Sequence, residues 1–221
     1  MKKLCIFDLD GTLNDTITAI SHFGNTALYE ALGKEPIDKE EYKKFAGDGR
    51  DVLIHRMLDF YGLDNEENFI KTRKIYDFHY ESNPLYKTDA FDGIKELILD
   101  LKNNGVKIAV CSNKPDNVVQ DVIKNVFGDV FDAVCGAREG YKTKPDPVLT
   151  MEIISNIGAD KQETYFIGDT NIDIFTAKNA GVKAIGVLWG FRDEAELRDA
   201  GADYIVSNPS EIYNIVKETK I

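Results

Sequence analysis

The stretch Lys3–Leu13, KLCIFDLDGTL, places two carboxylates directly after a short apolar run. Leu4 to Phe7 are all apolar, a pattern typical of a strand that is buried on both faces of a parallel sheet. Asp8 and Asp10 follow, and in extended backbone two residues this far apart point to the same side. Because open parallel sheets bind ligands at the carboxyl ends of their strands, the pair predicts a site at that edge.

Composition limits what this site can serve. The chain has 221 residues, 43% of them hydrophobic, which is enough for a sizeable core in one or two domains. Its 27 basic and 38 acidic residues leave a formal net charge of -11, which argues against nucleic acid and anionic membrane as partners. The apolar runs are too short for a membrane span or a signal peptide, so we expect a cytoplasmic protein.

The three cysteines favour the same compartment. Cys5, Cys111 and Cys135 are odd in number, lie in apolar runs and show no CxxC spacing. Reduced, buried thiols are therefore expected in place of a disulfide or a zinc site.

Apolar residues at helical spacing dominate the segment after the first motif. They predict four helices: Thr16–Leu32, Asp38–Ala46, Asp51–Tyr61 and Glu66–Glu81. The segment shows no convincing strand, so residues 15–84 are expected to form a helical cap domain. Residues 1–14 and 85–221 would then form the core domain around the cap.

After Pro84 strands and helices alternate. Apolar runs predict strands at 106–111, 131–135, 164–167, 182–187 and 204–206, with a helix between each strand and the next. Such alternation implies right-handed crossovers and a parallel sheet covered on both faces. The expected fold class is α/β, with a Rossmann-like parallel sheet.

Polar residues also gather at three later places in the chain that we expect to lie at the same edge of the sheet. Ser112 and Asn113 come after one predicted strand, Lys144 precedes a proline turn, and Asp169 and Asp173 follow another strand. Each has an ordinary structural explanation as a cap or turn residue. Together they would bring a hydroxyl, a cation and further carboxylates to the edge that carries the first two aspartates. A calcium loop would also begin like Asp169–Asp173, but Ile174 stands where that loop needs glycine.

With these motifs in order, the chain resembles the haloacid dehalogenase superfamily of phosphotransferases. DLDGT at residues 8–12 matches the first family motif, Ser112 the second, Lys144 the third, and GDTNID at residues 168–173 the fourth. The resemblance covers essentially the whole chain, including a helical cap after the first motif. GDGR at residues 47–50 and the stretch 186–212 are most similar to phosphoglycolate phosphatases and their close relatives.

The resemblance implies a magnesium-dependent phosphatase that hydrolyses a small phosphorylated metabolite through an aspartyl-phosphate. Asp8 would be the nucleophile and Asp10 the general acid and base, as carboxylates can be. The other implied assignments are Ser112 and Lys144 as catalytic residues, Thr12, Asn113 and Arg50 in substrate binding, and Asp8, Asp10, Asp169 and Asp173 around Mg²⁺. Asp10 would bind the metal by its backbone carbonyl, and Asp173 would lie close by or act through water.

Several alternatives stay open within and outside this family. A β-phosphoglucomutase-like or pyrophosphatase-like enzyme shares both aspartates, although such mutases carry a cap histidine where Ile20 stands here. A phosphoaspartate receiver domain would be shorter, with its aspartate well inside the chain. Metal-free dehalogenases typically lack the second aspartate, so Asp10 favours phosphate chemistry. A monomer or weak homodimer is expected, and the sequence leaves the substrate open.

Overall fold

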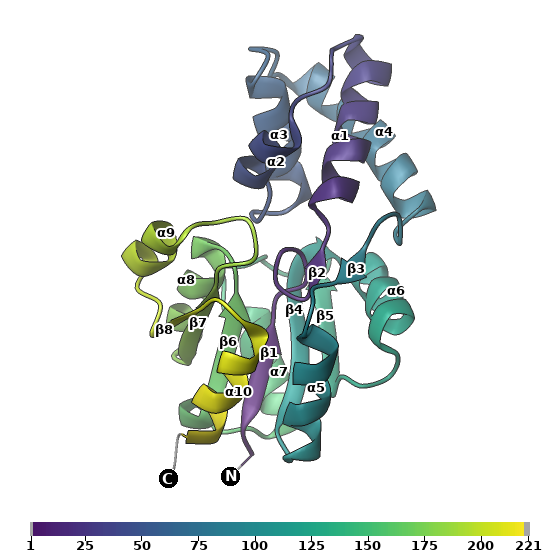
Figure 1. Cartoon of the computed structure of the whole chain (residues 1–221). Helices are drawn as coiled ribbons and strands as arrows, with labels where there is room; N and C mark the ends of the chain where they lie inside the picture. Colours follow the sequence, from purple (N-terminus) through teal and green to yellow (C-terminus); the bar gives the residue numbers. More distant parts are fainter. Residues whose placement is uncertain (1, 219–221) are drawn as a thin grey trace.

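The structure is a computed structural model that describes residues 2–218. Its centre is a six-stranded parallel sheet in the order β5-β4-β1-β6-β7-β8 (Figure 1). The strands are β1 (Leu4–Phe7), β4 (Lys107–Pro115), β5 (Ala133–Ala137), β6 (Thr164–Gly168), β7 (Lys183–Val187) and β8 (Tyr204–Val206). The helices of the core are α5 (Ile94–Asn103), α6 (Asp116–Phe127), α7 (Val148–Ile157), α8 (Asn171–Ala180), α9 (Glu194–Ala200) and α10 (Pro209–Glu218). The predicted α/β fold is confirmed.

The first strand is the centre of the core. β1 pairs with β4 on one side and β6 on the other, and its four residues are fully buried. Cys5 and Phe7 join the hydrophobic cluster that includes α5, α6 and α10, whereas Leu4 and Ile6 join the cluster of α7, α8 and α9. Alternate residues of a strand face opposite sides of the sheet, so helices on both faces require a continuous apolar run.

The end of β4 differs from the sequence prediction. The strand was expected to end at residue 111, but β4 continues to Pro115 and α6 begins at Asp116. The register between β4 and β5 shifts after Cys111, and the strand then pairs again at Pro115. Ser112 and Asn113 therefore lie within the last part of a strand, at the edge where β1 ends.

Residues after β1 form a helical bundle at one end of the sheet (Figure 1). Its helices are α1 (Ile17–Leu32), α2 (Lys39–Phe45), α3 (Arg50–Asp59) and α4 (Glu66–Ser82). The chain enters and leaves the bundle through a two-stranded antiparallel ribbon, β2 (Asn14–Asp15) paired with β3 (Asp89–Ala90). This ribbon was not predicted, because strands of two residues carry no periodic signal.

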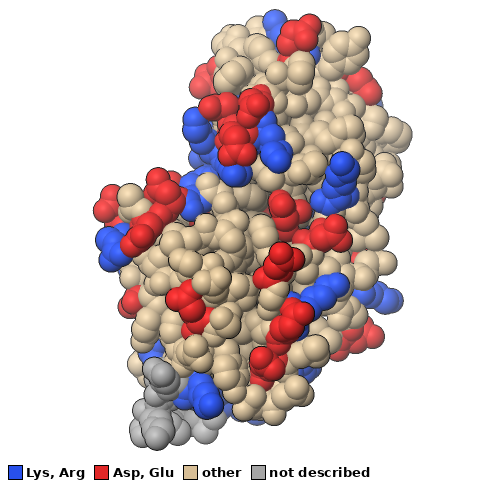
Figure 2. All heavy atoms as spheres, viewed as in Figure 1, with Lys and Arg blue, Asp and Glu red and all other residues tan. Residues whose placement is uncertain are grey.

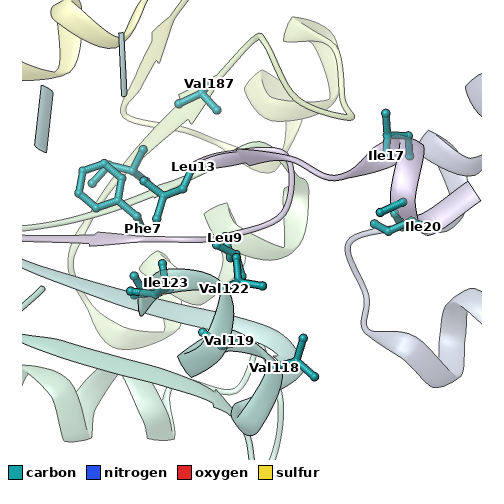
Figure 3. Packing of buried hydrophobic residues seen from close by; sticks show 14 of the residues in the cluster. Phe7, Leu9, Leu13, Ile17, Ile20, Val118, Val119, Val122, Ile123 and Val187 are labelled. Carbon is teal, nitrogen blue, oxygen red and sulfur yellow. The ribbon is translucent and has the colours of Figure 1, made fainter. Parts of the chain in front are cut away.

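Apolar and polar contacts hold the bundle against the core. One hydrophobic cluster includes Leu9 and Leu13 of the core and Ile17 and Ile20 of α1 (Figure 3). On the other side, the Arg192 guanidinium donates hydrogen bonds to the carbonyls of Lys43 and of Ala46, the latter at 2.8 Å. Carbonyls at the end of a helix lack partners within the helix, so a guanidinium is well suited to bind them.

The charged surface is mixed. On the face shown in Figure 2, basic and acidic side chains are interspersed and do not gather into one basic patch. None of the helices within residues 2–218 has the length and the apolar character needed to span a bilayer.

Candidate active site

The polar residues predicted from the motifs meet at the carboxyl ends of β1, β4 and β6. Asp8 directly follows β1, Ser112 lies near the end of β4, and Asp169 directly follows β6. The three strands are neighbours in the sheet, so these side chains converge. The Asp8 amide donates to the Ile167 carbonyl at 2.9 Å, which continues the strand ladder to the site.

Lys144 lies between two of the carboxylates. Its ammonium is 2.8 Å from Asp8 Oδ1 and 2.7 Å from Asp173 Oδ1, and all three side chains are buried. Burial opposes the charge of Lys144, but Asp173 and Asp8 together raise its pKa above the ordinary value. Burial raises the pKa of Asp8 to about 7, against the lowering effect of Lys144. The buried charges of Lys144, Asp8 and Asp173 are therefore stabilised by their contacts with one another.

The two later aspartates are oriented by hydrogen bonds. Asp169 accepts from the Thr12 hydroxyl on Oδ1 and from the Phe191 amide on Oδ2, both at 2.8 Å. Asp173 Oδ2 accepts from the Thr170 amide at 3.0 Å and from the Thr170 hydroxyl at 2.8 Å, a capping box that begins α8. Thr12 is fully buried, so its observed role is to orient Asp169.

Three of the aspartates could hold a metal ion. One ligand oxygen from each of Asp8, Asp169 and Asp173 lies within 4.8 Å of the others. Burial raises the pKa of Asp169 well above the ordinary value, and the charges of Asp173 and Asp8 raise it further. Lys144 offsets part of this negative charge. A donor set of carboxylate oxygens suits a hard cation such as Mg²⁺, so the residues fit the predicted cofactor.

Asp10 is bound by a lysine that the sequence analysis did not select. Both of its carboxylate oxygens accept from the Lys114 ammonium, at 3.0 and 2.8 Å. Asp10 raises the pKa of Lys114 above the ordinary value although burial lowers it. Lys114 directly follows Ser112 and Asn113. Its position beside the second motif was the one feature of the sequence that could have marked it as a site residue. Its partner is 104 residues away in sequence.

Ser112 and Asn113 support the site in different ways. Ser112 is buried and its hydroxyl accepts from the Lys114 amide at 3.3 Å. The Asn113 side chain accepts from the Lys144 amide at 2.8 Å and donates to the Lys144 carbonyl at 3.2 Å. Asn113 thus holds the backbone of the lysine that contacts Asp8. Its assignment to substrate binding stays a prediction.

A cleft opens between this edge and the helical bundle. It has a volume of about 70 Å³ and is lined from the core by Asp8, Asp10, Ser112 and Lys114 and from the bundle by Ile20, Arg50, Tyr76 and Tyr80, among others. Arg50 thus lines the cleft, and its assignment to substrate binding stays a prediction. Its Nη1 is 3.1 Å from both carboxylate oxygens of Asp77, and its Nε is 2.9 Å from Asp51. The guanidinium is already paired with two carboxylates.

A loop after β7 completes the site, and sequence reasoning did not assign it a role there. The Trp189 indole donates to the Thr12 carbonyl at 3.0 Å. Gly190 lies so close to Asp169 and Gly11 that a Cβ at position 190 would overlap both. Gly11 has φ +83 and also lies against the Asp169 carboxylate. Side chains larger than hydrogen would displace Asp169 at either position.

Known proteins are similar to this chain in sequence. The model of the haloacid dehalogenase-like hydrolase family matches residues 5–187. A phosphoglycolate phosphatase of Aquifex aeolicus is 30% identical over 217 residues, which are 97% of this chain and 96% of the relative. One of Vibrio parahaemolyticus is 28% identical over 219 residues, with the same shares covered.

A solved structure is equally similar. The crystal structure of a candidate phosphoglycolate phosphatase from Lactobacillus delbrueckii subsp. bulgaricus superposes with a TM-score of 0.93 at 30% identity. The match covers 98% of this chain and 99% of that one.

The paired aspartates, the buried lysine and the carboxylate cluster at the edge of a parallel sheet define a hydrolase site for phosphate monoesters. The chain belongs to the haloacid dehalogenase-like hydrolase family and is a phosphatase.

Proposed function

We propose that this phosphatase hydrolyses phosphoglycolate or a closely related small phosphorylated acid, with Mg²⁺ as cofactor. The observation that carries the proposal is the pairing of Asp8 and Asp10 beneath a small cleft that Arg50 and Lys114 also line. The small volume suits a short substrate. The names of the relatives favour phosphoglycolate among such substrates.

The chemistry follows from the two aspartates. The Asp8 carboxylate attacks phosphorus, and the bond to the ester oxygen breaks with its electron pair on that oxygen, which takes a proton from Asp10. Water then attacks the phosphorus of the aspartyl-phosphate and gives a proton to Asp10. The bond between phosphorus and the Asp8 oxygen breaks with its electron pair on that oxygen, which releases phosphate and restores the Asp8 carboxylate. Lys144 remains beside Asp8 throughout, where its charge offsets that of the phosphoryl oxygens.

The proposed cofactor would be held by Asp8, Asp169 and Asp173, with the Asp10 carbonyl as a further ligand. When bound, it would supply positive charge among the carboxylates and the phosphate group. Thr12 and Phe191 orient Asp169 for this role.

A mutase is the second candidate, because the core site is compatible with it. Ile20 lines the cleft from α1 with a buried apolar side chain. An isoleucine there cannot exchange protons with a sugar hydroxyl, so the cleft favours hydrolysis.

We also propose that residues 15–84 act as a cap on the core of residues 1–14 and 85–221. The β2–β3 ribbon would then be the hinge, and the Arg192 contacts would break when the cap opens. The cysteines are free; Cys5 and Cys111 are buried as predicted, whereas Cys135 is only partly buried. Free cysteines fit a protein of the reducing cytoplasm. A monomer or weak homodimer is proposed as the oligomeric state.

The activity can be tested by phosphate release. Wild-type protein with Mg²⁺ is expected to release phosphate from phosphoglycolate with a higher kcat/KM than from inorganic pyrophosphate, glucose phosphates or nucleotides. Excess chelator should abolish release, and added Mg²⁺ should restore it. Full activity in chelator would exclude the metal role. Preference for a glucose phosphate, with its isomer as product, would favour the mutase.

Arg50 is proposed to add positive charge on the cap side of the cleft. Since Asp77 and Asp51 already pair with it, we expect Arg50→Ala to raise KM for phosphoglycolate only about tenfold, near 1.4 kcal/mol. KM for ethyl phosphate, which has a methyl group in place of the carboxylate, should stay within about twofold of the wild-type value. Equal changes for both substrates, or none, would show that Arg50 does not sense the carboxylate.

A further inference from the structure

The cleft contains Lys114, a cation whose carboxylate partner, Asp10, takes part in the proposed reaction. Among the described residues that line it, two are cationic, Arg50 and Lys114. Arg50 is paired with two carboxylates of the cap, Asp77 and Asp51. The Lys114 ammonium binds Asp10, and its side chain is only 8% exposed. It belongs to the core, so it stays beside the reacting groups wherever the cap lies.

The geometry of the reaction brings the substrate to Lys114. Asp10 has to approach the ester oxygen to protonate it, and Lys114 Nζ lies 2.8 Å from Asp10 Oδ2. In phosphoglycolate the carboxylate is attached to the carbon next to that oxygen. A substrate placed for proton transfer therefore brings its carboxylate to the region of the Lys114 ammonium.

Tyr80 of α4 adds a second polar group at the same place. Its ring centroid lies 4.6 Å from Lys114 Nζ. Tyr80 lines the cleft, and its buried hydroxyl makes no hydrogen bond of ordinary geometry, although it lies close enough to Lys114 to raise the pKa of the ammonium. A hydroxyl in this setting gains free energy from a bound acceptor.

Charge balance favours exchange of partners at Lys114. If a substrate carboxylate takes the place of the Asp10 carboxylate, the buried ammonium keeps an anionic partner throughout, so the exchange costs little. The opposite wall can contribute less, because Arg50 is already paired with Asp77 and Asp51, and because Asp77 and Glu81 line the cleft there. Their charges would repel a second carboxylate.

We propose that Lys114, together with the Tyr80 hydroxyl, binds the second anionic group of the substrate, which displaces Asp10 from Lys114 and leaves it beside the ester oxygen. This inference rests on the proposed function and deepens it, since it names the residues that select an acidic substrate. Lys114 is then a specificity-determining residue, and Tyr80 links selection to closure of the cap.

The test compares two substrates that differ only in the second anionic group. The measured quantity is the ratio of kcat/KM for phosphoglycolate to kcat/KM for ethyl phosphate. Misplacement of Asp10 would slow both reactions equally and leave this ratio unchanged, whereas loss of a carboxylate contact lowers it. We expect Lys114→Met to lower the ratio roughly a hundredfold, the scale for truncation of a buried charge pair.

Two milder variants, one that keeps the charge of Lys114 and one that keeps the ring of Tyr80, test the proposal even if Lys114→Met folds poorly. Lys114→Arg should retain most of the ratio, and Tyr80→Phe should lower it about tenfold. The matched controls are Lys142→Met and Tyr29→Phe, which change an exposed lysine of the core and an exposed tyrosine of the cap. Both controls should keep the wild-type ratio.

The outcomes separate this inference from the proposed function. An unchanged ratio in both Lys114→Met and Tyr80→Phe would overturn the inference and leave the phosphatase assignment intact. If the wild type does not prefer phosphoglycolate to ethyl phosphate, phosphoglycolate is not the substrate. A panel of longer phosphorylated acids, such as 3-phosphoglycerate, then decides: a preference that depends on Lys114 supports the inference, and no preference for any acid overturns it.

Discussion

Asp8→Asn is expected to abolish turnover, with kcat lowered by about 10⁴- to 10⁶-fold, the scale seen when a nucleophile is removed. An amide cannot form the aspartyl-phosphate, and the other carboxylate beside Lys144, that of Asp173, is held by Thr170 at the start of α8. Phosphate release from phosphoglycolate with saturating Mg²⁺ measures the loss. The control is Asp59→Asn, which changes an exposed aspartate of the cap and should retain wild-type activity.

Asp8→Asn should leave the fold intact. The pH dependence of stability indicates whether the variant is more or less stable than the wild type. The pKa of Asp8 is about 7 in the folded protein, above the ordinary value of 3.8. The unfolded chain therefore releases this proton at lower pH, so Asp8 lowers wild-type stability as pH rises from about 4 to 7. In chelator at pH 8, Asp8→Asn should unfold at the same temperature as the wild type or higher. Near-normal turnover in a correctly folded Asp8→Asn protein would exclude Asp8 as the nucleophile.

The core could be predicted from the sequence because the residue pattern of each segment agrees with the strand or helix that the segment forms. The run Leu4–Phe7 is apolar at every position since both faces of β1 are covered. Asp8 could be selected because it directly follows the apolar run, and Lys144 because it precedes a proline turn. That prediction needed no knowledge of the distances between the residues.

Contacts between distant segments could not be predicted in the same way. Lys114 looked like any lysine before a proline, and only the structure brings it to Asp10 and under Tyr80 of the cap. The place of Thr12 in substrate binding stays a prediction. Its hydroxyl donates to Asp169, 157 residues away, a contact that the sequence did not indicate. Arg192 likewise binds the end of α2 across 146 residues. Periodicity reports which face of an element is buried but not which residue lies opposite.

Asp10→Asn is expected to slow both chemical steps by roughly 10²- to 10⁴-fold, because the nucleophile stays and the proton carrier is lost. Asparagine has nearly the same shape, and its amide oxygen can still accept from Lys114, so the architecture of the site should persist. The two steps can be separated with p-nitrophenyl phosphate, whose leaving group needs little protonation. With this substrate the variant should form aspartyl-phosphate readily but hydrolyse it slowly.

The expected signature is a burst of p-nitrophenol equal to the enzyme concentration, followed by a slow steady rate. Mass spectrometry of the quenched protein should then show one added phosphoryl group, located on the peptide that contains Asp8. Asp8→Asn is the control and should give neither burst nor adduct. Asp10→Asn acting at the wild-type rate on phosphoglycolate would show that another group carries the proton. A slow rate with p-nitrophenyl phosphate and no adduct would place the loss in a first step that needs little protonation, and would contradict the role of Asp10 as the proton carrier.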